Sequence, residues 1–269
     1  MFKPPAVYNS VMKAIVCSTR EQASMNLFER FLEKGFDATD LSFNGYGIYE
    51  YNDVMLVRTD EPITHADSIN GLDASEIVFA SPHTAASGIH AFAVHFIGNF
   101  GSADLGGLPQ KLSQANANTA RNIFKEIQKR MPEGFIATIE CTHHGPDIDT
   151  PVCFAELGSS AAQWGNTGAA SYLADCIIAG IMSNEEKPTA IAIGGNHYAA
   201  KFTALMGEYA LGHICPKYNQ QNLNKEMIQQ MIDKTVPGPE KIFIDKNGVT
   251  GKTELLKMLS AFDLQIVQI

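Results

Sequence analysis

Eight consecutive residues, ECTHHGPD at 140–147, hold two acids, one thiol and two adjacent imidazoles. Imidazole and carboxylate groups are the commonest general acids and bases of enzymes. Together with thiolate, they are also the protein ligands of Zn²⁺. Charged side chains are seldom gathered for packing alone, and here they surround a Gly-Pro pair that favours a turn. The segment therefore indicates a site that performs chemistry.

Other polar loops follow apolar segments that the sequence predicts to be strands. SPHTAASG follows a strand at 76–80, GNF follows one at 90–97, and GGNHYA follows one at 189–193. Open α/β sheets bind their ligands at the carboxyl ends of the strands. We therefore expect these loops and the 140–147 segment to converge on one rim. The residues predicted to bind substrate in these loops are Thr84, Asn99 and Asn196.

A metal site is one interpretation of this rim. His83, His143 and His197 would supply three imidazole ligands, and a catalytic Zn²⁺ keeps its fourth position open for water. Glu156 lies late in a predicted apolar strand, where an unpaired carboxylate is costly to bury, and it would add a carboxylate ligand. Neither an HExxH motif nor a CxxC pair is present, so the histidine set alone indicates Zn²⁺.

A metal-free site is the alternative. His144 would then act as the general base, with Glu140 or Glu156 orienting its ring. Cys141 is expected to be a buried cysteine rather than a nucleophile. The other histidines are expected to be packing or surface residues, and they are His65, His90, His95 and His213.

The order of elements indicates an α/β fold with a mostly parallel sheet and helices on both faces. Short apolar strands alternate with amphipathic helices, as in sheets that are buried on both sides. Residues 47–59 predict a hairpin with Asn52 and Asp53 as its turn, and Asn166 or Thr167 is expected to cap a long helix.

Two lobes are expected, an N-terminal α/β lobe at 12–110 and a C-terminal hydrolase-like lobe at 111–269. After the linker VPGPE, residues 236–269 are expected to form a hairpin-and-helix appendage. Residues 1–11 contain two prolines and are expected to form a loose extension ahead of the first strand.

Composition limits the class of protein. The 269 residues carry a net charge of -9, and no apolar run is long enough to span a membrane, so DNA and membrane partners are not expected. Five cysteines, an odd set, favour a reducing compartment, and we expect a cytoplasmic monomer or small homo-oligomer. Arg121, Lys125 and Lys129 recur at four-residue spacing on a predicted helix, and they are the predicted contact for a nucleic-acid backbone.

Five ordered motifs resemble the D-aminoacyl-tRNA deacylases of the archaeal and plant type. The motifs are ASPHTAASG (80–88), GNF (98–100), ECTHHGP (140–146), ELGSS with Trp164 (156–164) and IGGNHYA (193–199). The resemblance extends from about Met12 to the 220s. It is weaker in residues 1–11 and in the last thirty residues, neither of which contains the predicted rim.

The resemblance implies chirality proofreading, in which the ester joining a D-amino acid to the 3′ end of tRNA is hydrolysed. It also implies a fold similar to that of phosphorylases and zinc peptidases, and dependence on Zn²⁺. Water would be activated by His144 or by the metal, and Glu156 would orient or accept a proton. Two other functions stay open: a zinc-dependent amidohydrolase or peptidase, and a non-catalytic tRNA-binding module.

Overall fold

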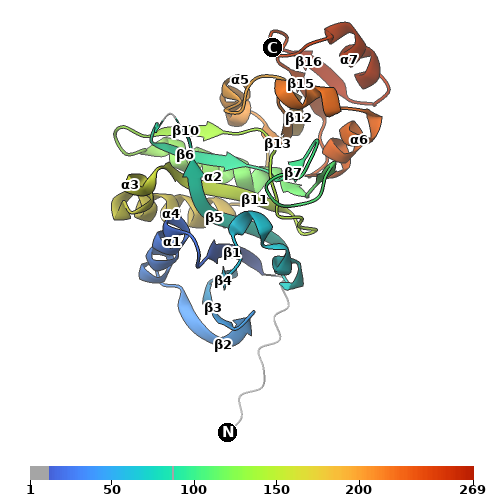
Figure 1. The fold of residues 1–269 in the computed structure, drawn as a ribbon. Helices are drawn as coiled ribbons and strands as arrows, with labels where there is room; N and C mark the ends of the chain where they lie inside the picture. The colour runs from blue at the N-terminus through green and yellow to red at the C-terminus, as the bar shows by residue number, and fades with distance from the viewer. Residues whose placement is uncertain (1–11, 87) are drawn as a thin grey trace.

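The structure, a computed structural model, describes residues 12–86 and 88–269 (Figure 1). The extension predicted at 1–11 lies outside the described residues. The described strands form a ten-stranded sheet, a four-stranded sheet and a two-stranded ribbon. In the described part of the chain, no helix is both long and apolar enough to cross a membrane.

The ten-stranded sheet is mostly parallel. Eight of its strands follow one another in the order β10 (Ile136–Ile139), β6 (Ala91–His95), β11 (Val152–Ser159), β5 (Glu76–Thr84), β1 (Lys13–Ser18), β4 (Val54–Thr59), β3 (Tyr46–Tyr51) and β2 (Asp37–Phe43). β9 (Ala115–Asn116) pairs with β11 and with β14 (Thr235–Val236), and the ribbon consists of β7 (Gly98–Asn99) and β8 (Lys111–Leu112). The predicted hairpin is confirmed as β3 and β4, which pair antiparallel.

The direction of β6 and β10 decides where the polar residues meet. These two strands are parallel to each other, but β6 is antiparallel to β11, whereas β11 is parallel to β5. The end of β6 therefore lies beside the first half of β11, where His95 pairs with Phe154. The expected convergence on the carboxyl ends of parallel strands is wrong in this respect. The polar residues gather where the carboxyl ends of β6 and β10 lie close to β11 and to the carboxyl end of β5.

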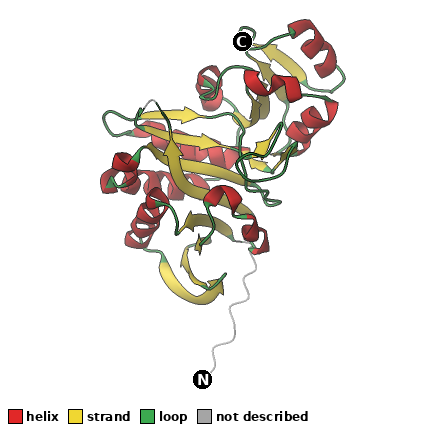
Figure 2. Cartoon of the chain, in the orientation of Figure 1, coloured by secondary structure: helices red, strands yellow, loops and turns green. Residues whose placement is uncertain are grey.

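Helices cover both faces of the large sheet, as predicted. On one face lie α1 (Gln22–Glu33), α2 (Ala117–Lys129) and α4 (Thr167–Ile181), which Figure 2 shows gathered on the same side of the strands. Their apolar stripes, such as Leu27 and Phe31 of α1, are fully buried. The opposite face packs against the 3-10 helices η1 (Ile63–His65) and η2 (Asp67–Gly71). Asn166 caps α4 by accepting a hydrogen bond from the Ala169 amide (3.0 Å), which confirms that prediction.

The four-stranded sheet is entirely parallel. Its order is β13 (Ala210–Cys215), β12 (Thr189–Ile193), β15 (Lys241–Ile244) and β16 (Gln265–Gln268). Apolar residues of α6 (Lys225–Asp233) and α7 (Lys252–Leu259) cover one of its faces. The remaining helices are α3 (Ala161–Trp164), α5 (Ala200–Thr203) and η3 (Ala204–Gly207), together with η4 (Lys217–Asn222).

The last thirty residues are part of this second sheet. The predicted hairpin is wrong, because β15 and β16 run parallel, with α7 between them in sequence, and β15 lies beside β12. In Figure 1 these orange-to-red segments gather at the end of the molecule opposite β2 and β3. The two predicted lobes do not coincide with the two sheets, because the ten-stranded sheet takes strands from both sides of residue 110.

Candidate functional site

The carboxylate of Glu156, on β11, is buried at the centre of the site. Ser81 Oγ donates to its Oε1 (3.0 Å), and His83 Nδ1 donates to its Oε2 (3.2 Å). His95 Nε2 lies 3.3 Å from Oε1. Burial alone would raise the pKa of Glu156, but attraction to His95 and the hydrogen bond from His83 hold this pKa well below its usual range. Glu156 is therefore a carboxylate at neutral pH.

Glu140, directly after β10, is buried with less complete partners. Its Oε1 lies 3.4 Å from His197 Nε2 and 3.6 Å from His83 Nδ1, and its Oε2 lies 4.0 Å from His143 Nε2. Neither oxygen has a hydrogen bond from the residues that the structure describes. A buried carboxylate is costly without a nearby cation. The three predicted metal ligands therefore surround a carboxylate, Glu140, that needs a positive charge beside it.

Two of the histidines have a raised pKa. Contact with Cys141 Sγ at 3.4 Å and with the nearby Glu140 carboxylate raises the pKa of His197 to about 10, so this ring is an imidazolium at neutral pH. Burial lowers the pKa of His83, but the hydrogen bond to Glu156 and the charge of Glu140 outweigh burial, and the pKa of His83 lies above its ordinary value.

The adjacent histidines of the 140–147 segment are neutral. Burial and the neighbouring His95 lower the pKa of His143 well below its ordinary value and the pKa of His144 to about 3. Their rings pack together with 4.4 Å between centroids, and the ring of His95 lies 4.2 Å from that of His143. Within one site, the chain thus holds neutral and protonated imidazoles side by side.

Both sheets hold the 140–147 segment in place. The amide of Glu140 donates to the Val94 carbonyl on β6 (3.0 Å), and the amide of Thr142 donates to the Ile214 carbonyl on β13 (2.9 Å). The Thr142 hydroxyl also contacts Nδ1 of the fully buried His213 (3.1 Å). His213 is therefore a packing residue, as expected, and it fixes the segment to the second sheet.

The turn that presents His144 is tightly packed. His144 has a left-handed backbone conformation with φ of 43°, which is uncommon for a residue with a side chain and is often found at functional sites. At the next position, a Cβ on Gly145 would lie 2.2 Å from the Gly107 amide nitrogen. Glycine at 145 is therefore required for this close approach.

A second glycine positions His83. His83 lies within β5, opposite Gly158 on β11, rather than in the loop after the strand. A Cβ on Gly158 would lie 2.4 Å from the His83 carbonyl oxygen and 2.5 Å from its Cβ. The indole of Trp164 donates to the same carbonyl at 2.9 Å. The ELGSS motif and Trp164 thus fix the backbone from which His83 reaches Glu156.

A cavity of about 370 Å³ opens onto these groups, a volume suited to a small organic ligand. Its lining includes all of the predicted catalytic and metal-binding residues together with Thr84, namely His83, Thr84, Glu140, His143, His144, Glu156 and His197. The sequence correctly predicted that these residues converge.

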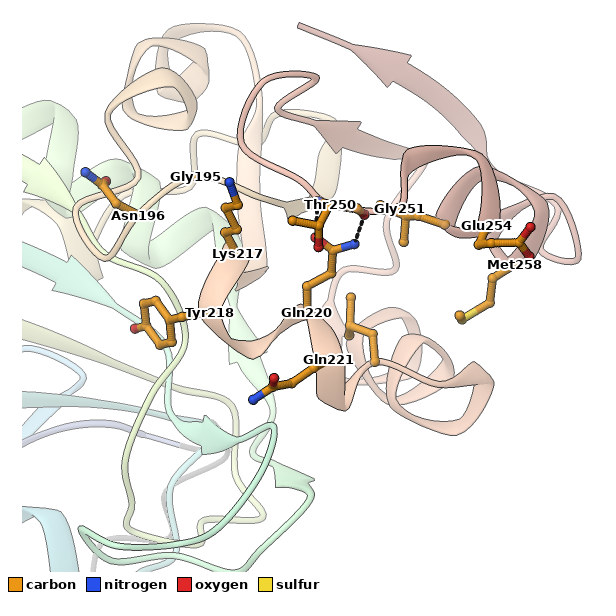
Figure 3. A pocket seen from close by; sticks show the side chains of 12 residues that line it. Gly195, Asn196, Lys217, Tyr218, Gln220, Gln221, Thr250, Gly251, Glu254 and Met258 are labelled. Carbon is orange, nitrogen blue, oxygen red and sulfur yellow. Dashed lines mark hydrogen bonds between the residues drawn. The ribbon is translucent and has the colours of Figure 1, made fainter.

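Two asparagines predicted to bind substrate lie outside this cavity's lining. Asn99 donates from Nδ2 to the Gly106 and Leu108 carbonyls, so its amide supports a neighbouring loop. Asn196 lines a second cavity, of about 720 Å³, between η4 and α7. Figure 3 shows Asn196 and Tyr218 at one end of this cavity and Gln220 hydrogen-bonded to Thr250 between its walls.

Tyr218 lines the second cavity and contacts His197, which lines the first. Its hydroxyl lies 3.2 Å from Cys141 Sγ and 3.3 Å from His197 Nδ1, and the ring is 53% exposed. Cys141 is fully buried, as expected. Tyr218 therefore places one edge of the larger cavity in contact with the catalytic groups.

The basic stripe on α2 is smaller than predicted. The structure does not favour the predicted contact of Arg121 with a nucleic-acid backbone, because Arg121 is buried and pairs with Glu185 (3.2 Å). Lys129 lies at the surface but pairs with Glu126 (2.6 Å). Lys125 and Lys129 stay predicted contacts for tRNA, whereas Arg121 is a structural residue.

Sequence patterns missed two residues of the site. His95 was expected to be a packing or surface residue, yet it contacts Glu156 because β6 ends beside the first half of β11. Glu21, just before α1, also lines the catalytic cavity. Neither stands in a recognisable motif, so only the pairing of distant segments could reveal them.

The donor atoms around Glu140 suit Zn²⁺. Zn–N and Zn–O bonds of about 2.0–2.2 Å place neighbouring ligand atoms roughly 3.3–3.6 Å apart, as Glu140 stands from His197 and His83. The predicted ligands His83, His143 and His197 do not form one group of mutually close atoms among the described residues. Glu140 lies near all three. Two of the groups that do are His83, Glu140 and Glu156, and Cys141, His143 and His197.

Comparison with known proteins identifies the family. A family model described as D-aminoacyl-tRNA deacylase matches residues 70–267, which include both buried carboxylates and the histidines around them. The chain belongs to the D-aminoacyl-tRNA deacylase family. D-aminoacyl-tRNA deacylases from two archaea are similar over nearly their whole length. That of Thermococcus onnurineus is 34% identical over 266 residues, covering 94% of this chain and 97% of the relative.

The deacylase of Pyrococcus furiosus is 32% identical, covering 91% of this chain and 94% of the relative. A crystal structure of a conserved protein of unknown function has the same fold, with a TM-score of 0.87 and 29% identity over 96% of this chain and 95% of that one. The α/β fold and the family suggested by the five motifs are therefore confirmed.

In this family member, Gly158→Ala should lower both stability and deacylase activity. The added methyl group would collide with the His83 backbone, and overpacking of this kind costs about 1–3 kcal/mol. The free energy of unfolding and the deacylation rate would be measured together. Gly47→Ala is the matched control, because nothing lies within 4 Å of its Cβ position on β3. Unchanged stability and rate in Gly158→Ala would show that His83 does not depend on this contact.

Proposed function

We propose that this chain hydrolyses the ester bond of D-aminoacyl-tRNA and releases the D-amino acid and tRNA. The observation that carries the proposal is the His83–Glu156 pair in the wall of a small-ligand cavity, beside a protonated His197. An aminoacyl ester is already activated, so the site needs to place a water and stabilise one oxyanion. Family membership supports this substrate, and it supports neither a peptidase nor a non-catalytic tRNA-binding module.

His83 is the general base in this proposal. When the ring is neutral, Nδ1 donates to Glu156, and Nε2, which lies 3.4 Å from the Tyr198 hydroxyl, would accept a proton from the attacking water. Glu156 orients the ring and stabilises the imidazolium that forms, as a carboxylate does in a catalytic triad. His144 was the base predicted from the sequence, but a pKa of about 3 makes it a weak base, and its Nδ1 lies 2.6 Å from the Gly145 carbonyl. Its proposed role is to shape the cavity wall.

His197 provides the positive charge. Its imidazolium is held by Glu140 at 3.4 Å and faces the cavity. A fixed cation that faces the reacting carbonyl would stabilise the negative oxygen of the tetrahedral intermediate. Glu140 keeps this ring protonated, so its proposed effect on the reaction is indirect.

Zn²⁺ is the alternative source of the same chemistry. Glu140, with the predicted ligands His83, His143 and His197, would hold the ion. When bound, it would lower the pKa of a bound water and polarise the ester carbonyl. The uncompleted hydrogen bonds of Glu140 and the neutral state of His143 suit such a role.

The function is tested by deacylation of D-Tyr-tRNA and L-Tyr-tRNA with purified protein, before and after a strong chelator. We expect hydrolysis of the D ester only, because family membership implies a cavity that rejects the L enantiomer. Loss of activity with chelator, restored by Zn²⁺, would favour the metal, whereas activity that survives would favour His83 and His197. A folded, zinc-supplied protein that hydrolyses neither ester would refute the proposal.

The second cavity is the proposed place for the 3′-terminal nucleotides of tRNA. It adjoins the catalytic groups through Tyr218, whose exposed ring offers a stacking surface for a base. Asn196 and Lys217 line it and would contact base edges and phosphate. Because the scissile ester is attached to the terminal ribose, the adjoining nucleotides must lie next to the catalytic cavity.

Lys217→Gln should weaken tRNA binding and reduce the slope of log affinity against log salt concentration by about one, since one phosphate contact is lost. Binding of uncharged tRNA would be titrated at several salt concentrations. Lys129→Gln tests the rival placement of the tRNA on the α2 stripe. A larger effect of Lys129→Gln than of Lys217→Gln would move the tRNA to α2 and reject this placement.

A further inference from the structure

A third carboxyl group lines the catalytic cavity, outside the His83–Glu156 pair and Glu140. Glu21 stands directly before α1, and its Oε1 accepts a hydrogen bond from the Ile63 amide of η1 at 3.0 Å. Its Oε2 is buried and has no hydrogen-bond partner in the described part of the chain. A carboxyl group that lines a cavity and has this incomplete set of partners is suited to a ligand that carries a donor.

The surroundings of Glu21 indicate that this ligand is a cation. Within the described residues, no lysine or arginine forms an ion pair with Glu21. Burial, together with the charge of Glu156 and opposed only in part by the Ile63 hydrogen bond, raises the pKa of Glu21 to about 7. Glu156 and Glu140 already have histidine partners, whereas Glu21 has none among residues 12–86 and 88–269. A positive group in the cavity would therefore gain most by approaching the carboxyl group of Glu21.

We propose that Glu21 is the binding subsite for the α-ammonium group of the D-aminoacyl ester. The inference rests on the proposed function, because that substrate carries a primary ammonium one carbon away from the scissile carbonyl. An ammonium at Glu21 and a carbonyl beside His83 and His197 fix two of the substituents of the α-carbon. The two other substituents of the α-carbon, the substrate's side chain and its hydrogen, then point in fixed directions. These two directions are exchanged in the L enantiomer, which makes Glu21 one determinant of the preference for D over L.

The direct test compares a free and an acylated amine. The substrates are D-Tyr-tRNA and N-acetyl-D-Tyr-tRNA, which differ in the positive charge of the nitrogen. Glu21→Gln should lower kcat/KM for D-Tyr-tRNA by about 10- to 100-fold, the loss expected for a hydrogen bond between charged groups. For the N-acetyl ester, the same variant should act like the wild type, since no charge is left to recognise.

Binding separates this inference from the proposed function. The probe is 3′-deoxy-3′-(D-tyrosylamino)adenosine, whose amide resists hydrolysis, and its N-acetyl form, titrated by calorimetry. Wild-type protein should bind the free amine more tightly than the N-acetyl form, and Glu21→Gln should abolish the difference. This result would support the subsite even if the wild type hydrolysed no ester, in which case only the proposed function would fail.

Two variants control for structure. Glu21→Gln retains an oxygen that can accept from the Ile63 amide. Glu21→Asp retains the charge on a shorter side chain, so this variant should keep part of the preference for the free amine. Glu33→Gln, at the other end of α1 and paired with Arg30, should leave both substrates unaffected. Equal losses for the free and acetylated esters in Glu21→Gln, or full activity on D-Tyr-tRNA, would overturn the inference.

Discussion

Burying the carboxylates of Glu140 and Glu156 is costly unless donors and cations surround them, and the arrangement of the histidines follows from that cost. His83 and His95 approach Glu156, while His197, His83 and His143 approach Glu140. The carboxylates in turn set the charge of the rings nearest to them. His197 is held protonated, whereas His144, which is paired with a backbone carbonyl, is held neutral. Acid, base and cation functions thus arise from one cluster.

This cluster exists because two sheets meet at a single segment. Residues 140–145 leave β10, bond to β6 on one side and to β13 on the other, and turn back at Gly145. The second sheet also provides His197 after β12 and Tyr218 after β13. The ten-stranded sheet carries Glu156, Ser81, His83 and His95, and the second sheet adds His197 as a partner of Glu140. The C-terminal strands β15 and β16 therefore support the site by completing the sheet that carries His197.

Local patterns were enough to predict what depends on neighbours in sequence. Alternation with an Asn-Asp turn predicted the β3–β4 hairpin, and an Asn before an apolar run predicted the α4 cap. The motifs around His83, His143 and His197 predicted that these residues come together, because polar residues after apolar strands seldom serve packing. The family resemblance, carried by the same motifs, is confirmed.

What the sequence did not predict depends on the pairing of distant segments. Nothing in the residues of β6 reveals that it runs antiparallel to β11, and this direction alone brings His95 to Glu156. Likewise, spacing on α2 placed Arg121 with Lys125, but the helix turns Arg121 into an interface where Glu185 pairs with it. Glu21 has no motif of its own, and it becomes part of the cavity only because α1 starts beside η1.

The measurement that tests the account most directly is the single-turnover rate of D-Tyr-tRNA deacylation by Glu156→Gln. Glutamine keeps the shape of the side chain and removes the charge that holds His83. Glu76→Gln is the control, because Glu76 is a partly buried carboxylate on β5 that pairs with Lys13 and does not line the catalytic cavity. We expect the deacylation rate of Glu156→Gln to fall by about 100-fold or more. The unfolded fraction of this variant should stay negligible at the assay temperature. The rate of Glu76→Gln should be near normal. A folded Glu156→Gln variant that deacylates at the wild-type rate would contradict the account.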